Sequence, residues 1–345
     1  MFSGGKLLDE GSYGCIFTPV LQCKNKKEPI GDDNHPPISK LILTDSANLE
    51  YSISKIIRQI PLWKNYFVVS ESICEPSPIQ KDKDISKCGI IDNHKLSDFR
   101  ILTMPYGGKS LNTYRININN FDFMEFVIHF IEAGAVLNLF GIVHRDIHQG
   151  NILVDDEQVP RIIDFNLAIP VNKKVSSSDL DHTYNYITGQ EPPDSTLVNA
   201  INLGYKSERV INSLIDKKPI MRKIRSILGV SQYEQHLALD KFYSESKSVK
   251  AGDSVAWFNN YWRTIDSWAI GVNIVDLIAK LSLWPEFSST LRKVRPDLFP
   301  VLKKLCDVSP VHRIDCVQAL NKLAPNSFII RRYGKAWLAK VGTGF

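Results

Sequence analysis

Two short apolar runs, each interrupted by a polar turn, dominate the middle of the chain. The first lies within residues 141–153 (GIVHRDIHQGNIL) and the second within residues 162–166 (IIDFN). Short runs rich in Ile, Val and Leu and bounded by turn residues predict buried strands. We therefore expect strands with Asp146, Asn151 and Asp164 on closely spaced turns between them.

These three side chains form a set with a recognisable chemistry. A phosphoryl-transfer site needs a carboxylate to orient the attacking hydroxyl, and an amide with a second carboxylate to hold magnesium against the nucleotide phosphates. The residues also resemble the catalytic and metal-binding loops of eukaryotic-type protein kinases, which read His-Arg-Asp, four residues, Asn, and then Asp-Phe-Gly. A His-Arg-Asp tripeptide alone arises often by chance, whereas this whole pattern between strand-like runs is rare.

The resemblance extends over nearly the whole chain of 345 residues and implies an α+β, two-lobed kinase-like fold. The small N-terminal lobe is expected to be β-rich with one main helix, and the larger C-terminal lobe to be mostly helical. The implied boundaries are residues 1–106 for the small lobe, 107–327 for the large lobe and 328–345 for a C-terminal extension, with polar insertions at about 24–37, 71–97 and 200–255. The last insertion is expected to be a helix-breaking stretch.

Residues 8–16 resemble the kinase glycine-rich loop, in which glycines let backbone amides approach phosphates. Gly11 and Gly14 match the pattern, and Asp9 stands where the first glycine is usual. Two glycines around an aromatic residue also make an ordinary hairpin turn, so that alternative stays open. The resemblance implies nucleotide contacts from Leu8, Gly11, Ser12, Tyr13, Gly14, Cys15 and Ile16.

Lys40 is a single charge inside an apolar run, residues 38–43, that predicts a buried strand. A buried ammonium is costly unless anions pair with it. Lys40 therefore resembles the kinase lysine that contacts the α and β phosphates, although a lysine on an edge strand would instead face solvent. The next segment, about residues 46–60, predicts a helix with an isoleucine stripe, and Glu50 is its only acid and the expected partner of Lys40.

The helix stripe comprises Ile53, Ile56, Ile57 and Ile60, and residues 44–46 supply candidate N-caps. Residues 100–108 resemble the strand that enters the kinase hinge. On that alignment Met104 is the gatekeeper, and the backbone of Pro105 and Gly107 binds the adenine edge.

In the large lobe, residues 121–140 predict a long buried helix that precedes the catalytic loop. The resemblance assigns Asp146 to the substrate hydroxyl, and Asn151 and Asp164 to Mg²⁺. His148 replaces the usual lysine that screens the transferring phosphoryl group, and a neutral histidine contributes no charge there. Asn166 replaces a glycine and is expected to adopt positive φ, which asparagine tolerates best among non-glycine residues.

Further family elements lie downstream. Residues 167–194 contain several hydroxyl side chains and resemble an activation segment, which ends at Asp194. Asp194 is expected to pair with a buried Arg313, and Asp266 in Asp-Ser-Trp-Ala-Ile-Gly is expected to brace the backbone of the catalytic loop. A proline turn and a surface arginine are the alternatives for the first pair. The basic residues of the tail are read as a solvated helix face or a contact for an acidic surface.

Composition excludes several other classes. No apolar run approaches the roughly 18 residues of a membrane span, and the N-terminus has no secretory apolar region. A net charge of +5 is mild and calls for no nucleic acid. The six cysteines show no repeated CxxC spacing, which predicts reduced thiols in a cytoplasmic protein; a metal held by Cys23, Cys74 and Cys88 is the alternative.

The sequence as a whole predicts a serine/threonine protein kinase that uses ATP and Mg²⁺ and acts on protein substrates. It is similar to the divergent kinases of large cytoplasmic DNA viruses, which would place it in the host cytoplasm or the virion. Two other functions stay open. One is a catalytically weak pseudokinase scaffold that binds nucleotide, and the other is a small-molecule kinase of the aminoglycoside type.

Overall fold

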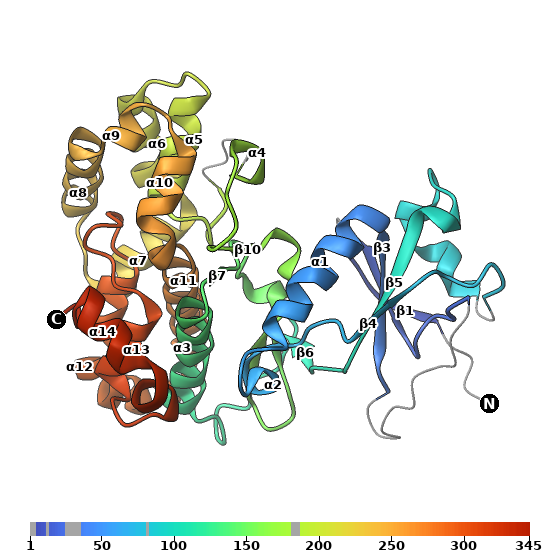
Figure 1. Cartoon of the computed structure of the whole chain (residues 1–345). Helices are drawn as coiled ribbons and strands as arrows, with labels where there is room; N and C mark the ends of the chain where they lie inside the picture. Colours follow the sequence, from blue (N-terminus) through green and yellow to red (C-terminus); the bar gives the residue numbers. More distant parts are fainter. Residues whose placement is uncertain (1–4, 12–13, 25–35, 81–82, 181–186) are drawn as a thin grey trace. The chain divides into compact units, whose positions relative to one another are not determined.

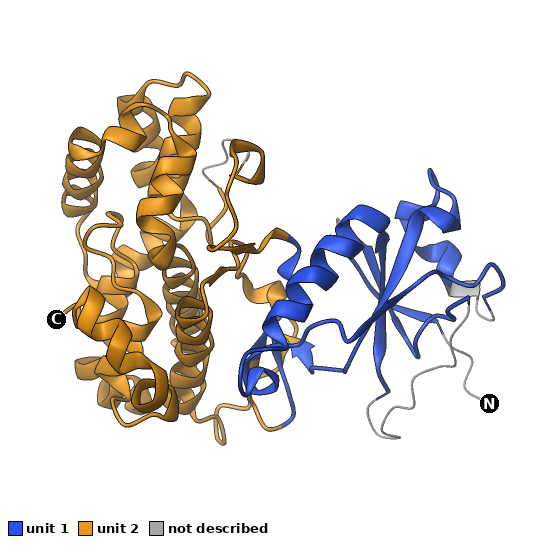
Figure 2. Ribbon diagram, in the orientation of Figure 1, with its two compact units in different colours: residues 1–109, 153–156, 161–166 blue, residues 110–152, 157–160, 167–345 orange. Residues whose placement is uncertain are grey.

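The structure is a computed structural model that describes residues 5–11, 14–24, 36–80, 83–180 and 187–345. It is a mixed α+β chain that divides into two compact units, shown in different colours in Figure 2. Unit 1 comprises Met1–Lys109, Leu153–Asp156 and Arg161–Asn166, and unit 2 comprises Ser110–Ile152, Glu157–Pro160 and Leu167–Phe345. The chain therefore returns to unit 1 for two short segments, the second of which carries Asp164.

Unit 1 is built on a five-stranded antiparallel sheet of order β1-β2-β3-β5-β4, drawn in blue and cyan in Figure 1. Its strands are β1 (Lys6–Gly11), β2 (Gly14–Thr18), β3 (Ile38–Leu43), β4 (Ser72–Cys74) and β5 (Phe99–Met104). The predicted hairpin and the strands around Lys40 and Met104 are confirmed. Residues 71–97, expected to be an insertion or a long hairpin, begin with β4, which pairs antiparallel with β5. Short 3₁₀ helices follow at Lys83–Lys87, Gly89–Ile91 and Leu96–Asp98.

The two faces of this sheet bury different clusters, as the period of two along a strand requires. One face packs Ile38, Ile42 and Leu102 against Ala47 of helix α1 (Thr44–Ile57). The opposite face packs residues of odd number in β2, β3 and β5 around the pair Cys15 and Cys88: Phe17, Leu41, Phe99 and Ile101. Lys40 has even parity in β3, so its side chain leaves the sheet on the α1 face.

Helix α1 differs from its prediction in three respects. It ends at Ile57 rather than at residue 60, and α2 (Trp63–Tyr66) follows. Its N-cap is Leu43, without a side-chain cap, whereas the Thr44 hydroxyl donates to the Asp98 carbonyl. Ile56 faces solvent, although the other three members of the isoleucine stripe are buried. The stripe is therefore narrower than predicted, because a single sheet face covers the helix.

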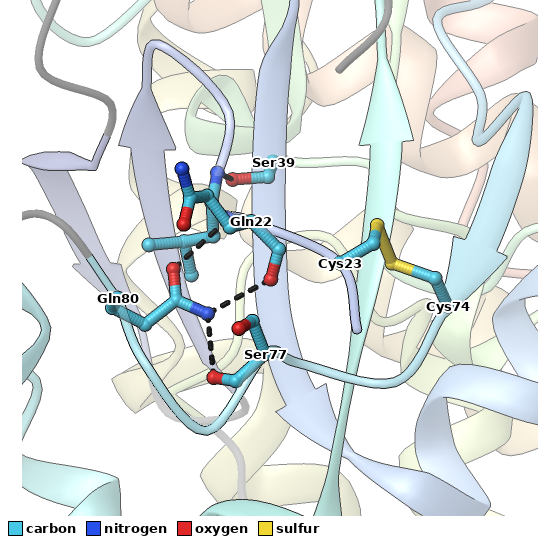
Figure 3. The surroundings of a disulfide bond; sticks show 7 residues. Gln22, Cys23, Ser39, Cys74, Ser77 and Gln80 are labelled. Atoms are coloured by element: carbon cyan, nitrogen blue, oxygen red, sulfur yellow. Dashed lines mark hydrogen bonds between the residues drawn. A yellow bond between two sulfur atoms is a disulfide. The ribbon is translucent and has the colours of Figure 1, made fainter. Parts of the chain in front are cut away.

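Four cysteines of unit 1 form disulfides, so the predictions of reduced thiols and of a cysteine metal site are both wrong for them. Cys15 bonds to Cys88 and Cys23 bonds to Cys74. Figure 3 shows the second bond beside a network in which the Gln80 side chain contacts the backbone of Gln22 and Ser77. Among the described residues no group of three or more His, Cys, Asp or Glu could hold a metal.

Unit 2 is mostly helical. Its main helices are α3 (Phe123–Leu139), α5 (Pro193–Asn202), α6 (Ser207–Lys217), α7 (Pro219–Leu228), α8 (Gln232–Glu245), α10 (Ser254–Tyr261), α11 (Ile265–Leu281), α12 (Phe287–Leu305) and α13 (Cys316–Leu323). Short helices α4 (Ser177–Leu180), α9 (Lys247–Lys250) and α14 (Lys335–Val341) complete the set. The long buried helix predicted before the catalytic loop is confirmed as α3.

Residues 200–255 are mostly helical, so the prediction that this stretch breaks helices is wrong. The apolar residues Ile220, Met221, Ile224 and Leu228 of α7 are all buried and follow a helical period. The helical spacing of these apolar residues is present in the sequence, but the sequence analysis gave more weight to the polar residues between them. No helix of the described residues has both the length and the apolar character needed to cross a membrane.

Short strands carry the segments around the candidate site: β6 (Lys109–Ser110), β7 (Ile142–Val143), β8 (Ile152–Val154), β9 (Pro160–Ile162) and β10 (Ile169–Pro170). Within unit 2, β7 and β10 pair antiparallel. The C-terminal tail packs on unit 2 through Trp337, whose indole N–H donates to the buried carboxylate of Asp315. Its basic side chains Arg331, Arg332, Lys335 and Lys340 are exposed, as a solvated helix face requires.

Candidate active site

The Lys40 ammonium lies between two carboxylates of unit 1. Lys40 Nζ is 2.8 Å from Glu50 Oε2 and 2.8 Å from Asp164 Oδ1. β3 has a neighbouring strand on each side, which excludes the alternative of a solvent-facing lysine on an edge strand. The predicted pairing of Lys40 with Glu50 is confirmed, and Asp164 joins the same ion cluster.

Burial and charge act against each other in this cluster. Burial acts to lower the pKa of the Lys40 amine, but the attraction of Glu50 and Asp164 outweighs it and raises that pKa. Burial raises the pKa of the Glu50 carboxyl, and Lys40 offsets only part of that rise. Lys40 therefore stays charged, and it is the counter-ion of both carboxylates.

Asp164 has φ of +64°, in the left-handed region that non-glycine residues rarely adopt. The prediction placed positive φ at Asn166 instead, and it is wrong. Asn166 lies in a 3₁₀ turn, Phe165–Leu167, and is buried. Phe165, between these residues, packs edge-on against Phe67 with ring centroids 5.7 Å apart. The positive φ thus falls on the residue that the sequence predicts as a metal ligand, and strained backbone of this kind is common at functional sites.

The other nucleotide-contact residues predicted in unit 1 lie in different surroundings. Ile16 and Met104 pack in the cluster on the α1 face, which also receives Leu153 and Ile163. Cys15 is on the opposite face in its disulfide, so its side chain is not on the face that carries Lys40 and Ile16. Leu8 and Pro105 are exposed, Glu50 pairs with Lys40, and Ser12 and Tyr13 lie outside the described residues.

Two of the predicted glycines have a packing reason to be glycine. A Cβ on Gly14 would lie 2.2 Å from the Ile42 side chain and 2.5 Å from the Leu41 carbonyl. A Cβ on Gly107 would lie 2.6 Å from Val68. Among the described residues, the nearest atom to a Cβ on Gly11 would be the Gly14 carbonyl oxygen, at 3.8 Å. The packing of the sheet therefore requires a glycine at Gly14.

In unit 2 the carboxylate of Asp146 is held from several sides. Asn151 Nδ2 donates to the Asp146 backbone carbonyl at 2.9 Å and to Oδ2 at 3.3 Å. Gln190 Nε2 donates to Oδ1 at 2.9 Å, and His148 Nε2 lies 3.7 Å from Oδ2. The structure thus brings together the three predicted residues of the catalytic loop and adds Gln190, which the sequence analysis did not identify.

His148 is oriented by its own loop. Its Nδ1 accepts the Gly150 backbone N–H at 3.0 Å. An accepting Nδ1 carries no proton, so the neutral ring carries its proton on Nε2, the nitrogen nearer Asp146. His148 can therefore donate one hydrogen bond toward the Asp146 side.

The backbone of the loop that contains Asp146 is braced by Asp266, as predicted. Asp266 is buried at the start of α11 and accepts the backbone N–H groups of His144 at 2.7 Å and Arg145 at 2.9 Å. Burial raises the pKa of the Asp266 carboxyl, and these donors oppose the rise. Arg145 has φ of +72°, and Asn273 further along α11 donates to the Ile147 carbonyl. α11 thus holds a strained loop in one conformation.

The segment that leads into α5 is pinned at successive residues. The Lys218 ammonium donates to the Thr188 carbonyl, and the Trp268 indole donates to the Gly189 carbonyl at 3.0 Å. Glu191 Oε1 then accepts the Ser195 hydroxyl at 2.9 Å. No local sequence pattern indicates the contacts of Lys218 and Trp268, because these residues lie 30 and 79 positions from their partners in the chain.

Asp194 and Arg313 form the ion pair that the sequence predicts. Arg313 Nη2 lies 2.6 Å from Asp194 Oδ1, and both side chains are fully buried. The Trp257 indole donates to the other oxygen, Asp194 Oδ2, at 3.0 Å. The alternatives of a proline turn and a surface arginine are therefore excluded. Such a buried pair costs several kcal/mol when one partner is removed, about 3–5 kcal/mol in general.

A cavity of about 170 Å³ adjoins this segment within unit 2. Arg145, Asp146, Gln190 and Glu191 line it together with residues of α5 and α10. Burial raises the pKa of the Glu191 carboxyl despite the attraction of Lys218. The Arg145 guanidinium donates to the Asp179 carbonyl at 2.6 Å, which ties the cavity wall to α4.

The donor set of two predicted ligands suits Mg²⁺, which prefers hard oxygen ligands and few protein groups. Asp164 offers a partly exposed carboxylate, and its backbone has a left-handed conformation. Asn151 uses its amide nitrogen on Asp146, which leaves its carbonyl oxygen as the side-chain atom suited to a cation. Each residue is thus chemically fit for the metal.

Lys218 is expected to make the free energy of unfolding vary with pH in the alkaline range. Burial lowers the pKa of its amine to about 8, although Glu191 and Asp194 oppose that shift. In the unfolded chain a lysine holds its proton up to about pH 10.4. Between these values the unfolded state binds more protons, so this group adds stability as pH rises.

The contribution of Lys218 to the free energy of unfolding should increase from pH 8 to pH 10. We therefore expect the change in that free energy over this interval to be more positive in the wild type than in Lys218→Met. Urea unfolding at both pH values measures it. Lys217→Met, which removes an exposed lysine next to it, is the matched control and should behave like the wild type. An equal change in Lys218→Met and the wild type would contradict the assignment.

Comparison of the chain with protein-family models found no matching family, and comparison with curated proteins found no match.

Proposed function

We propose that this protein transfers the γ-phosphoryl group of ATP to serine or threonine hydroxyls of protein substrates, with units 1 and 2 as the small and large lobes of a kinase-like fold. The observation that carries the proposal is the ion cluster in unit 1. Lys40 lies on a central strand at 2.8 Å from both Glu50 and Asp164. A buried lysine shared by two carboxylates is an expensive arrangement that a sheet core does not need.

The proposal gives each side chain one task. Lys40 contacts the nucleotide phosphates, and Glu50 holds Lys40 in place. Asp146 orients the hydroxyl of the substrate and accepts its proton, while Asn151 fixes the Asp146 carboxylate. Asn151 and Asp164 would hold Mg²⁺, which when bound neutralises charge on the phosphates. His148 donates a hydrogen bond in place of a lysine charge.

A protein substrate is preferred over a small molecule for a specific reason. The segment that precedes Asp194 is anchored by Lys218, Trp268 and the buried Asp194–Arg313 pair. Small-molecule kinases of the aminoglycoside type generally lack the late arginine and the Asp266 element. A fixed segment beside Asp146 supports a platform for an extended peptide.

The test is transfer of label from γ-labelled ATP, with Mg²⁺, to a panel of protein substrates and aminoglycosides. We expect label on serine or threonine of protein, and none after Mg²⁺ is removed with a chelator. ATP binding without any transfer would favour the pseudokinase scaffold. Label on an aminoglycoside alone would favour the small-molecule kinase.

A further inference from the structure

Gln190 makes the shortest side-chain contact with the carboxylate of Asp146 among the described residues. Its Nε2 donates to Asp146 Oδ1 at 2.9 Å, while Asn151 Nδ2 reaches Oδ2 at 3.3 Å. The two donors come from different parts of unit 2, one from the catalytic loop and one from the segment before α5. A carboxylate held at both oxygens cannot rotate about its terminal bond without losing one donor.

Gln190 is itself held in place by its neighbours. The Gly189 carbonyl accepts the Trp268 indole at 3.0 Å, and the Thr188 carbonyl accepts Lys218. On the other side, Glu191 accepts the Ser195 hydroxyl at 2.9 Å. The backbone is thus held at the two residues before Gln190, and the side chain of the next residue is bound to α5, so the amide is presented at little cost in conformational entropy.

Gln190 also lies in the lining of two cavities of unit 2. It lines the cavity that contains Arg145 and Asp146, and it lines a second cavity of about 280 Å³ that contains His148 and Ile187. The contact with Asp146 is therefore part-buried, in a cavity wall and not inside the core of unit 2. A packing role alone would not require a polar side chain there.

We propose that Gln190 is a positioning residue that sets the orientation of the Asp146 carboxylate for the substrate hydroxyl; this inference rests on the proposed function. An ionised carboxylate has about four lone-pair sites, and one donor on Oδ1 leaves sites free to accept the hydroxyl proton. A neutral amide orients Asp146 without neutralising its charge. A lysine at position 190 would pair with Asp146 and weaken it as a base.

The consequence is a defect in kcat rather than in nucleotide binding. Gln190→Ala is expected to lower kcat about 10-fold or more, since misorientation of a catalytic group is costly. The KM for ATP should stay unchanged, because the lysine cluster of unit 1 is untouched. Gln232→Ala is the matched control: the exposed Gln232 Nε2 donates to Asp216 Oδ1 at 2.7 Å, and its loss should leave kcat unchanged.

Gln190→Glu supplies a signature that a merely structural role would not give. At pH 8 the new carboxylate repels Asp146 and has no proton to donate, so kcat should fall at least as far as in Gln190→Ala. As pH is lowered toward 6, a protonated glutamic acid can donate the same hydrogen bond. The ratio of kcat to that of the wild type should therefore rise for Gln190→Glu and stay flat for Gln190→Ala.

The outcomes separate this inference from the proposed function. Transfer by the wild type with an unchanged or higher kcat in Gln190→Ala would overturn the role of Gln190 alone, and so would a flat pH ratio for Gln190→Glu. Absence of transfer by the wild type would overturn the proposed function and this inference with it. Thermal unfolding of each variant shows whether a lower kcat comes from a less stable fold. If it does, the kcat ratio of Gln190→Glu between pH 8 and pH 6 tests the role of Gln190, since a rise supports it and a flat ratio overturns it.

Discussion

Asp146→Asn is expected to lower kcat for phosphoryl transfer about 1,000-fold while ATP still binds. An asparagine keeps the size of the side chain and can still contact Gln190, but it cannot accept the hydroxyl proton as a carboxylate does. General-base catalysis contributes about 100- to 10,000-fold to enzyme rates. The nucleotide-contact residues assigned in unit 1 are unchanged, so the affinity for ATP should be retained. Single-turnover transfer and equilibrium ATP binding measure the two quantities.

The control for Asp146→Asn is Asp156→Asn, which changes an exposed aspartate further along the chain. It should transfer at the wild-type rate. Transfer that persists in Asp146→Asn would remove Asp146 from the mechanism. Loss of ATP binding in the same variant would mean that the substitution disturbs the fold, and thermal unfolding would then show a lower midpoint.

Local patterns predicted the parts of the site that are close in sequence. The apolar runs around Lys40 and Asp146 identified strands and turns, and charge logic predicted Glu50 as a partner of Lys40, because a buried ion must find a counter-ion. The kinase resemblance, and not local pattern, implied Asp266 as the brace for the loop and the pairing of Asp194 with Arg313. The strands, the turns and the Lys40–Glu50 pair were predictable because apolar periodicity and the cost of burying a charge can both be read from the sequence.

The features that the sequence analysis missed depend mainly on how the chain folds as a whole. Gln190 is one polar residue among many, and only the folded chain brings it to Asp146. Positive φ fell on Asp164 and not on Asn166, because propensity names the residue that tolerates a strained backbone and not the residue that needs it. The cysteines carried no spacing signal, since their partners lie on different strands and turns.

The disulfides also bear on where the protein acts. Disulfides persist in oxidising surroundings and are rare in the reducing cytosol. Cys15–Cys88 and Cys23–Cys74 therefore weigh against the prediction of a protein that keeps its thiols reduced. The two remaining cysteines, Cys306 and Cys316, are buried in unit 2, where burial raises the pKa of each thiol and keeps it unreactive.

Loss of the Cys15–Cys88 bond is expected to destabilise unit 1 by about 4 kcal/mol. The bond joins residues 73 positions apart, and closing a loop of that length restricts the unfolded chain by about this amount in the chain-entropy model. Cys15 and Cys88 are also fully buried at the centre of one face of the sheet, so removal of their sulfurs costs packing as well. Cys15→Ala/Cys88→Ala, unfolded in urea without reductant, measures the loss.

Reduction provides the matched comparison. The wild type should lose stability in a reductant, whereas a variant with alanine at Cys15, Cys23, Cys74 and Cys88 should not respond. Titration of free thiols in the denatured chain, without reductant, should find two reactive cysteines among the six, namely Cys306 and Cys316. Six free thiols in the untreated protein would show that neither bond forms. Because β2 and β3 lie side by side in the sheet that carries Lys40, the affinity for ATP should fall together with the stability of unit 1.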